Sequence, residues 1–253
     1  MKRKIKVSII TPLYNSAPYI ERTIQSVQKQ SFFEWELIVI DDCSSDNGIQ
    51  VVEEWARRDS RIKVLKNSVN SGAAISRNKG IEAAKGKYIA FLDSDDQWHK
   101  EKLEKQIGFM QEKNVGFTYS YYNHIDEEGK EISATTNLPE KVDYVSLMKS
   151  NKIGCLTAMY DTSFFGKVYM KNIRKRQDYT LWLQLLKKTK YAYCVPEVLA
   201  TYTVRKGSVS SNKWSLIKYH WIIYRRIEKQ SFIKSLYYLF CYFIYYVSIK
   251  FKK

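Results

Sequence analysis

The sequence predicts an α/β protein with a mainly parallel central sheet that is flanked by helices. Short apolar runs of β-forming residues alternate with longer stretches in which apolar residues recur at helical spacing, as in βαβ units. The short runs are almost continuously apolar, which is typical of strands in a sheet covered on both faces. With 253 residues, of which 45% are hydrophobic, the chain is long enough to bury a sizeable core.

The N-terminal part of the chain shows this alternation most clearly. In its first helical stretch Ile20, Ile24 and Val27 recur at helical spacing, and Ser16 stands where a helix N-cap is expected. Gly86 is expected to end the third helical stretch. The expected elements are strands at 6–10, 35–40, 61–67 and 87–92, and helices at 15–30, 45–59 and 72–86.

The second part of the chain is less regular. The clearest element is a helix over residues 174–190, in which an apolar face includes Leu181 and Leu185. A hairpin turn is expected at Gly129. The other expected elements are a strand and hairpin over 115–132, a helix over 141–151, a strand with a turn over 153–165, and short extended segments within 191–211.

Polar residues follow all four expected strands of the N-terminal part. In open α/β sheets ligands bind beyond the carboxyl ends of the strands. Asp, Asn and Ser are also ordinary turn and cap residues, so any one of these loops has an equally good structural interpretation. Together the four loops predict a ligand-binding edge. They read TPLYN (11–15), DDCSSD (41–46), NSVNSG (67–72) and DSDD (93–96).

Three carboxylates, Asp93, Asp95 and Asp96, follow the fourth expected strand of a chain whose formal net charge is +16. Carboxylates about 4 Å apart repel by a few kcal/mol, so the cluster needs a cation or hydrogen-bond donors. Oxygen ligands suit Mg²⁺, Mn²⁺ or Ca²⁺ and not structural zinc, and the pattern lacks the Gly and downstream Glu of an EF-hand loop. A Mg²⁺ or Mn²⁺ held by one or two carboxylates keeps positions open for phosphate oxygens, which favours a diphosphate ligand.

Three segments carry a resemblance to a known family. They are VSIITPLYNSAPYIERTIQSVQKQSFFEWELIVIDDCSSD, NSGAAISRNKGIEAAKGKYIAFLDSDD and RQDYTLWLQL. In order and spacing the chain resembles the inverting family 2 glycosyltransferases of the GT-A fold over roughly residues 5–210. The resemblance implies a UDP-sugar donor and a Mn²⁺ or Mg²⁺ cofactor.

The resemblance also implies roles for individual residues. Asp42 would contact the uracil, Asp93 the ribose and the metal, and Asp95 would be the direct metal ligand, with Asp96 able to share either task. The other residues that it places around the nucleotide sugar are Thr11, Pro12, Tyr14, Asn15, Glu21, Asn70, Gly72, Arg77 and Asn78.

The resemblance implies that Asp178, in QDYTLWL, is the catalytic base. A general base takes the proton of the acceptor hydroxyl as its oxygen attacks the anomeric carbon, while a metal stabilises charge on the leaving diphosphate. Because Asp178 stands where a helix begins, it also has a purely structural interpretation as an acid favourable to the helix dipole.

The loop after the last expected strand departs from the family pattern. Where many members have a Tyr-Arg-x-His-like stretch before Ser-x-Ser, this chain reads YTVRKGSVS, with Thr203 and Arg205 at those positions. Arg205 could hold a diphosphate oxygen directly, because guanidinium groups bind phosphates well, but it cannot ligate a metal.

The C-terminal tail (213–253) differs in composition from the preceding catalytic domain (1–212). From Trp214 to Lys253 it has eight Lys or Arg residues, one acid and 13 aromatic residues. The apolar stretch between Lys234 and Lys250 is shorter than the roughly 20 residues of a bilayer span. A basic aromatic helical tail is expected either to attach to an anionic membrane surface or to pack on the catalytic domain.

These observations predict a cytoplasmic enzyme that is peripheral at the inner face of the cell membrane. The start of the chain has too short an apolar run for a signal peptide, and the four scattered cysteines read as reduced thiols. The expected acceptor is a sugar linked to a polyprenyl diphosphate, as in the assembly of O-antigen or capsule repeat units, and no nucleic acid partner is expected.

Two other functions fit parts of the sequence. A basic, aromatic RNA-binding protein would explain the charge, but the chain has no RRM-like aromatic motif, KH loop or zinc knuckle. A metal-dependent nucleotidyltransferase would also need acids at strand ends, yet it explains neither QDYTLWLQL nor the C-terminal tail.

Overall fold

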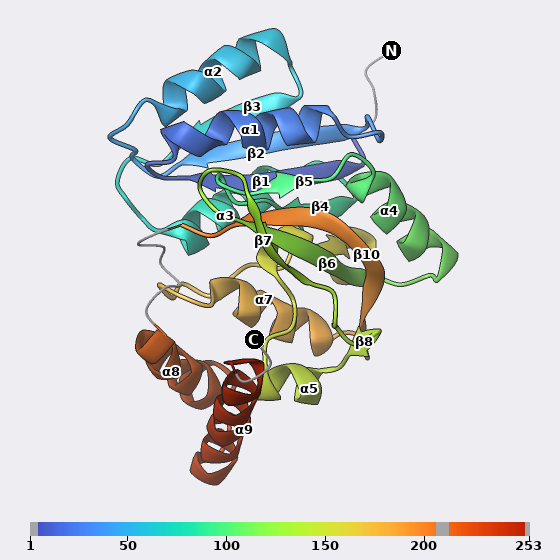
Figure 1. Ribbon diagram of the computed structural model, residues 1–253, viewed down its shortest axis with the longest axis vertical. Helices are drawn as coiled ribbons and strands as arrows, with labels where there is room; N and C mark the ends of the chain where they lie inside the picture. Colours follow the sequence, from blue (N-terminus) through green and yellow to red (C-terminus); the bar gives the residue numbers. More distant parts are fainter. Residues whose placement is uncertain (1–4, 206–212, 251–253) are drawn as a thin grey trace.

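The computed structural model of the chain describes residues 5–205 and 213–250 (Figure 1). Residue 212, where the predicted catalytic domain ends, lies outside these ranges. The strands are β1 (Val7–Leu13), β2 (Trp35–Asp41), β3 (Ile62–Lys66), β4 (Tyr88–Phe91), β5 (Gln97–Trp98), β6 (Phe117–Ile125), β7 (Glu131–Thr135), β8 (Lys141–Val142), β9 (Met159–Asp161) and β10 (Ala192–Thr203). The helices are α1 (Ala17–Gln28), α2 (Gly48–Arg58), α3 (Ala73–Ala83), α4 (Lys102–Glu112), α5 (Tyr144–Lys149), η1 (Cys155–Thr157), α6 (Thr162–Phe165), α7 (Gln177–Leu186), α8 (Lys213–Ile222), η2 (Ile223–Ile227) and α9 (Phe232–Lys250).

Within the described residues, ten strands form one mixed sheet in the order β3-β2-β1-β4-β9-β6-β10-β5, with β7 beside β6 and β8 beside β10. The pairs β3–β2, β2–β1 and β1–β4 are parallel, as the strand–helix alternation predicts. Beyond β4 the sheet is mixed, because β9 runs antiparallel to both β4 and β6. The predicted α/β class with a central sheet and flanking helices is confirmed.

Both faces of the sheet are covered, as the continuously apolar strands predict. Neighbouring residues of β1 point to opposite sides: Ile9 packs in one core cluster and Ile10 in the other. Helices α1, α2 and α4 contribute to the cluster of Ile9, whereas α3, α5 and α7 contribute to the cluster of Ile10. This layering leaves the carboxyl ends of β1, β2 and β4 at one open edge.

The start of α1 differs from the prediction in one respect. Ser16 occupies the N-cap position, but its hydroxyl donates a hydrogen bond to the carbonyl of Tyr14 and does not cap the helix. The Oδ2 atom of Asp46 accepts the hydrogen bond of the Ala17 amide at 2.7 Å instead. The cap therefore comes from the β2–α2 loop, which fixes the two loops relative to one another.

Two glycines give a matched test of backbone packing. A Cβ atom at Gly86 would lie 2.5 Å from the amide nitrogen of Ser8, which is backbone and cannot move aside. Gly86→Ala is expected to lower the free energy of unfolding by about 1–3 kcal/mol, the usual cost of overpacking. Gly108 lies exposed within α4 with no atom near its Cβ position, so Gly108→Ala should raise the stability by about 0.5–1 kcal/mol. Urea unfolding measures both, and equal effects of the two changes would contradict the packing argument.

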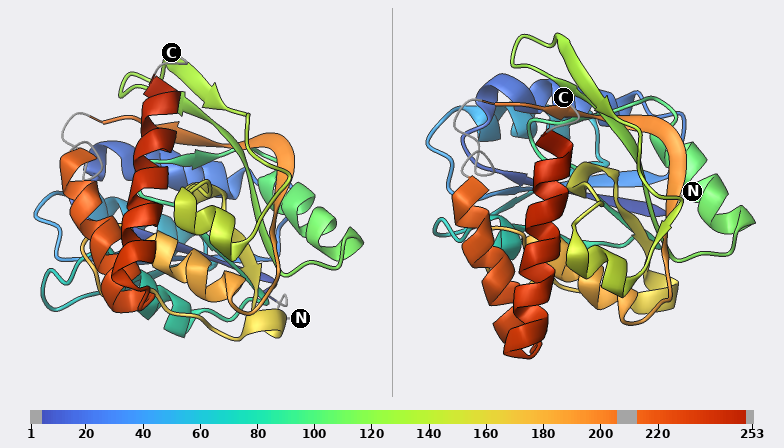
Figure 2. Two further views of the ribbon diagram at one scale, coloured as in Figure 1. Left: turned by 90° about the horizontal axis from the view of Figure 1, so that it is seen from below. Right: turned by 60° about the horizontal axis from the view of Figure 1, so that its bottom comes forward.

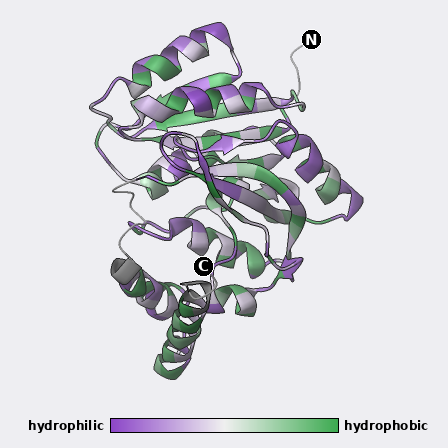
Figure 3. Ribbon diagram, viewed as in Figure 1, coloured by the Kyte–Doolittle hydropathy of each residue, from purple (hydrophilic) through white to green (hydrophobic). Residues whose placement is uncertain are grey.

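The described part of the C-terminal tail, residues 213–250, packs beside α5 and α7, and in Figure 1 it lies below them; Figure 2 shows the same helices from two other sides. Ile223, Tyr224 and Tyr238 belong to the same core cluster as α7, and the hydroxyl of Tyr224 donates to the carbonyl of Met148 at 2.9 Å. Hydropathy colouring shows α9 as strongly apolar (Figure 3). Among the helices of the described ranges, none has both the length and the apolar character that crossing a membrane requires.

Candidate active site

The four polar loops predicted at the strand ends meet at one edge of the parallel part of the sheet. The β1–α1 and β2–α2 loops are joined directly: the side-chain oxygen of Asn15 accepts the amide of Ser45 at 2.8 Å, and the Asn15 amide donates to the hydroxyl of Ser44 at 3.2 Å. Asn15 has a φ of 47°, a conformation that Asn tolerates better than most residues. The predicted residue Asn15 therefore shapes the edge of the site.

Asp42 organises the loop between β3 and α3. Its carboxylate accepts hydrogen bonds from the side chain of Asn67 at 2.7 Å, the amide of Ser71 at 2.8 Å and the amide of Gly72 at 2.7 Å. Gly72 has a φ of 84°, which is accessible to glycine at no steric cost. Asp42 is buried, and the contacts described here are with this loop. The uracil contact predicted for Asp42 remains a prediction.

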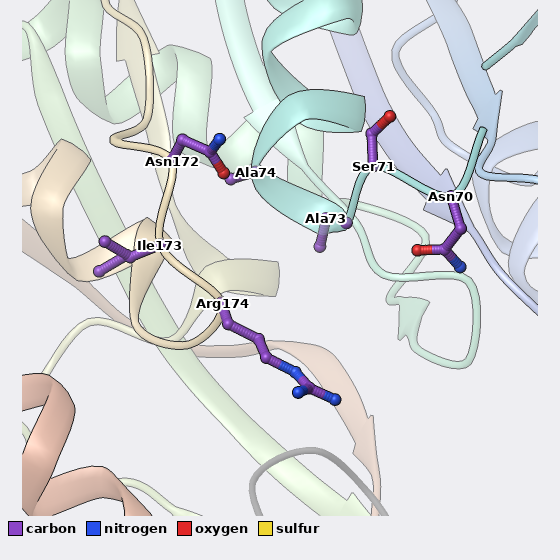
Figure 4. A pocket seen from close by; sticks show the side chains of 8 residues that line it. Asn70, Ser71, Ala73, Ala74, Asn172, Ile173 and Arg174 are labelled. Atoms are coloured by element: carbon purple, nitrogen blue, oxygen red, sulfur yellow. The ribbon is translucent and has the colours of Figure 1, made fainter. Parts of the chain in front are cut away.

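A pocket of about 310 Å³ opens beside the start of α3 (Figure 4). Two predicted residues, Asn70 and Gly72, line it on one side. The other side is formed by the segment that leads to α7, whose Arg174 was not predicted as a site residue. The complete lining consists of Asn70, Ser71, Gly72, Ala73, Ala74, Asn172, Ile173 and Arg174.

The three acids after β4 each have a different partner. Asp93 forms an ion pair with Arg77 of α3, and Asp95 forms one with Arg205 at 2.9 Å. Asp96 is buried and accepts the amide of Thr203 at 2.9 Å. Hydrogen-bond donors thus offset the repulsion that the sequence predicts for this cluster.

The electrostatics of the acids reflect burial and mutual repulsion. Burial raises the pKa of Asp95, the charge of Asp93 raises it further, and Arg205 opposes both effects. Burial, together with the charges of Asp95 and Asp93, raises the pKa of Asp96 well above its ordinary value. A cation at Asp93 and Asp95 would relieve this repulsion.

The donor set at the acids fits a hydrated Mg²⁺ or Mn²⁺. Among residues 5–205 and 213–250, no three or more His, Cys, Asp or Glu side chains are grouped so that they could enclose a metal. Mg²⁺ usually keeps several waters and needs only one or two protein carboxylates besides phosphate oxygens. Asp93 and Asp95, whose side chains are 30% and 23% exposed, can supply two, whereas Asp96 is engaged by the backbone of Thr203.

Asp178 lies in the first turn of α7, as predicted, and is half-buried. Its charge and that of Asp93 act on the same two groups. Burial lowers the pKa of Arg77, but Asp93, Cys155 and Asp178 more than offset this effect. Burial raises the pKa of Cys155, with further contributions from Asp93 and Asp178. The fold therefore places Arg77 and Cys155 where the charges of both Asp93 and Asp178 act on them.

Asn78 lies one residue after Arg77, but its side-chain amide is occupied by the backbone of Met170. It donates to the carbonyl of Met170 at 2.9 Å and accepts the amide of Met170 at 2.8 Å. This reciprocal pair fixes the segment between α6 and α7, which leads into the first turn of α7, where Asp178 lies. The structure therefore places Asn78 in a contact with the chain itself, and the nucleotide contact predicted for it remains a prediction.

Asn78→Ala separates these two interpretations. Loss of both hydrogen bonds should loosen the segment that leads to α7 and so the position of Asp178. The kcat should then fall by about tenfold to 100-fold, while the Kd for UDP changes less than twofold. Steady-state kinetics and isothermal calorimetry measure the two quantities. A weaker Kd with unchanged kcat would instead support a direct nucleotide contact.

Four other predicted residues lie along β1 and α1. Thr11 is buried in β1, and its hydroxyl has no hydrogen-bond partner among the described residues. Pro12 is half-buried in the same strand, and Tyr14 is 52% exposed just beyond it. Glu21 lies on the exposed side of α1.

The surroundings of Arg205 include residues that sequence reasoning missed. The ring of Tyr19 is contacted by two guanidinium groups, with Arg205 4.5 Å and Arg22 4.8 Å from its centroid. The hydroxyl of Tyr19 donates to Glu127 at 2.8 Å, and this hydrogen bond raises the pKa of Tyr19. No local pattern signals such a cluster, because its members come from α1, the β6–β7 turn and the end of β10.

The chain matches the family described as Glycosyl transferase family 2 over residues 8–174. TuaG of Bacillus subtilis (strain 168), named as a teichuronic acid biosynthesis glycosyltransferase, is 45% identical over 229 residues, which cover 90% of this chain and 91% of TuaG. WfgD of Escherichia coli, named UDP-Glc:alpha-D-GlcNAc-diphosphoundecaprenol beta-1,3-glucosyltransferase, is 38% identical over 239 residues, which cover 94% of this chain and 92% of WfgD.

Solved structures of low identity share the fold. The crystal structure of residues 1–349 of S. aureus TarS in complex with UDP-GlcNAc has a TM-score of 0.71 and 22% identity, covering 88% of this chain and 67% of that one. The matched residues include the four polar loops at the strand ends, and both relatives are matched over more than nine-tenths of their length. The chain therefore belongs to glycosyl transferase family 2.

Proposed function

We propose that the protein transfers a hexose from a UDP-sugar, with inversion, to a sugar that is linked to a polyprenyl diphosphate, in the assembly of a cell-surface polysaccharide. The observation that carries the proposal is the position of Arg77 in α3, which pairs with Asp93 and also feels the charge of Asp178. WfgD and WfaP, at 38% and 36% identity, are named for glucosyl transfer from UDP-Glc to GlcNAc-diphosphoundecaprenol, which supports the donor and acceptor classes.

In the proposed reaction Asp178 acts as the general base. Its carboxylate takes the proton of the acceptor hydroxyl as that oxygen forms a bond to the anomeric carbon of the donor sugar. The bond between the anomeric carbon and the diphosphate oxygen breaks on the opposite side, and UDP leaves with the bonding electrons. One displacement of this kind inverts the anomeric centre and gives a β-linkage from an α-linked donor.

The opposite side of the site would bind the diphosphate. Asp95 and Asp93 would hold Mn²⁺ or Mg²⁺, which supplies positive charge to the departing diphosphate. Arg77 and Arg205 add permanent positive charge at the same place, since each already pairs with one of these acids. Asp96 supports the site through the backbone of Thr203.

The proposed place of action is the cytoplasmic face of the cell membrane, where the protein would be peripheral. An acceptor with a polyprenyl chain stays in the bilayer, so the enzyme must reach the membrane surface. We further propose that residues 1–212 form the catalytic domain and that the C-terminal tail provides the attachment. We propose that the basic residues of the chain bind diphosphates and lipid headgroups and that the protein has no nucleic acid partner.

A panel of UDP-sugars tests the proposal. Each sugar is incubated with a synthetic GlcNAc-diphosphate-lipid acceptor, with and without Mn²⁺, and release of UDP is measured. We expect one UDP-hexose to react at least tenfold faster than the others, with strong dependence on the acceptor. Tight RNA binding without acceptor-dependent UDP release, or transfer of a nucleotidyl group to the acceptor, would overturn the assignment.

A further inference from the structure

Helix α9 presents an exposed apolar face that nothing in the described chain covers. Seven large apolar or aromatic side chains recur at helical spacing along α9 and so lie on one side of it. Each of them is between 46% and 79% exposed. The opposite face, which includes Ser235 and Tyr238, is buried against the rest of the protein. The seven exposed residues are Phe232, Ile233, Leu236, Tyr237, Phe240, Phe243 and Ile244.

Basic residues flank this face, which we call the α9 face. The ammonium group of Lys149 lies 5.8 Å from the ring centroid of Tyr237, and Lys152 has the same distance to the ring of Tyr245. Lys234 is exposed in the first turn of α9. The one acid of the described tail, Glu228, is buried and engaged by Lys187 at 2.6 Å. The surroundings of the α9 face are therefore apolar and positive.

We infer that the α9 face docks on the surface of a bilayer that contains anionic lipids. Tyr and Phe with flanking Lys suit the boundary between headgroups and acyl chains, and anionic headgroups complement the lysines. A second copy of the chain is a poorer occupant, because a two-fold contact through this face would bring the two sets of lysines together. Because the exposed side chains run along α9 from Phe232 to Ile244, the helix would lie in the plane of the surface.

The same helices connect the docking face to the catalytic part of the protein. The ring of His220 in α8 lies 5.5 Å from that of Tyr179 and 4.0 Å from that of Tyr242 in α9. Tyr179 directly follows Asp178 in α7. Docking through the α9 face thus holds α7 at a fixed position relative to the membrane. The surface itself needs neither the donor nor the acceptor assigned above, so its test is independent of them.

Vesicle flotation with the full chain tests the surface. The probes are vesicles of phosphatidylcholine alone and of phosphatidylcholine with phosphatidylglycerol. The double variant Phe240→Glu/Phe243→Glu places two acids on the α9 face, at side chains that are 62% and 54% exposed. Its matched control is Phe33→Glu/Phe164→Glu, which makes the same changes at phenylalanines 57% and 53% exposed elsewhere. Circular dichroism checks that all variants are folded.

We expect the wild type and the control to float with vesicles that contain phosphatidylglycerol. For the α9-face variant, the fraction of protein bound to these vesicles should be at least tenfold lower. Lys149→Glu/Lys234→Glu should weaken binding to the anionic vesicles more than to the neutral ones, and high salt should reduce this difference. The inference is overturned if the wild type binds neither vesicle, or if the control loses binding equally. It is also overturned if sedimentation shows a dimer that only the α9-face variant dissociates while vesicle binding is absent.

Discussion

Asp178→Asn is expected to lower kcat by about 10²–10⁴-fold, the usual contribution of a general base, while the Kd for UDP changes less than twofold. The amide has nearly the same shape as the carboxylate but cannot take a proton from the acceptor hydroxyl. Because Asp178 lies in the first turn of α7, the change also removes a favourable interaction with the helix dipole, worth about 0.3–1 kcal/mol. Rate measurements with saturating acceptor and calorimetric titration with UDP give the two quantities.

Asp143→Asn is the matched control for this prediction. Asp143 is the N-cap of α5, where its carboxylate accepts the amide of Ser146 at 2.7 Å. Asn caps helices about as well as Asp, so this variant should keep both stability and kcat. If Asp178→Asn turned over at the wild-type rate, Asp178 would be a helix-dipole acid and the base would have to be sought elsewhere.

Asp95→Asn is expected to weaken the Mn²⁺-dependent binding of UDP by at least about 100-fold. Loss of groups that merely support a metal ligand costs about 10–100-fold in affinity, and Asp95 is proposed to contact the ion directly. The amide keeps the size of the side chain and can still accept a hydrogen bond from Arg205, but it carries no charge. Titration of UDP at fixed Mn²⁺ and in EDTA isolates the metal-dependent part.

Asp59→Asn provides the comparison, because Asp59 is also a carboxylate paired with an arginine. Arg61 lies 2.7 Å from it, at a place outside the predicted site. This variant should leave the response to Mn²⁺ unchanged. If Asp95→Asn bound UDP with the wild-type affinity in Mn²⁺ and more weakly in EDTA, as the wild type does, this carboxylate would not hold the ion.

The parallel half of the fold was predictable, because each strand and helix there has an unbroken hydrophobic period. The second half was less so. Strand β10 spans Ala192–Thr203 as one strand, although it contains Pro196 and shifts register between Val195 and Ala200. Proline and bulges interrupt the alternation that identifies a strand, so short segments were expected there. Helix α4 and strand β5 were not among the predicted elements.

The strand-end site was predictable as a set of loops but not as a set of contacts. Carboxyl ends of parallel strands must meet at one edge, which places Asn15, Asp42 and Asp93 in the same region. No comparable rule predicts which side chains far apart in the sequence form hydrogen bonds or ion pairs with one another. The contacts of Asn78 with Met170 and of Asp95 with Arg205 join residues 92 and 110 positions apart, and only the folded chain reveals them.

The adjacency of Arg77 and Asn78 on α3 has a consequence for redesign of the enzyme. Arg77 pairs with Asp93, one of the acids proposed for the donor diphosphate, and Asn78 holds the segment that leads to the proposed base. A shift of α3 would displace both partners at once. Substitutions near α3 that retune donor choice and substitutions near Asp178 that retune acceptor choice should therefore show non-additive free energies in a double-mutant cycle. Donor and acceptor specificity would have to be selected jointly in this protein.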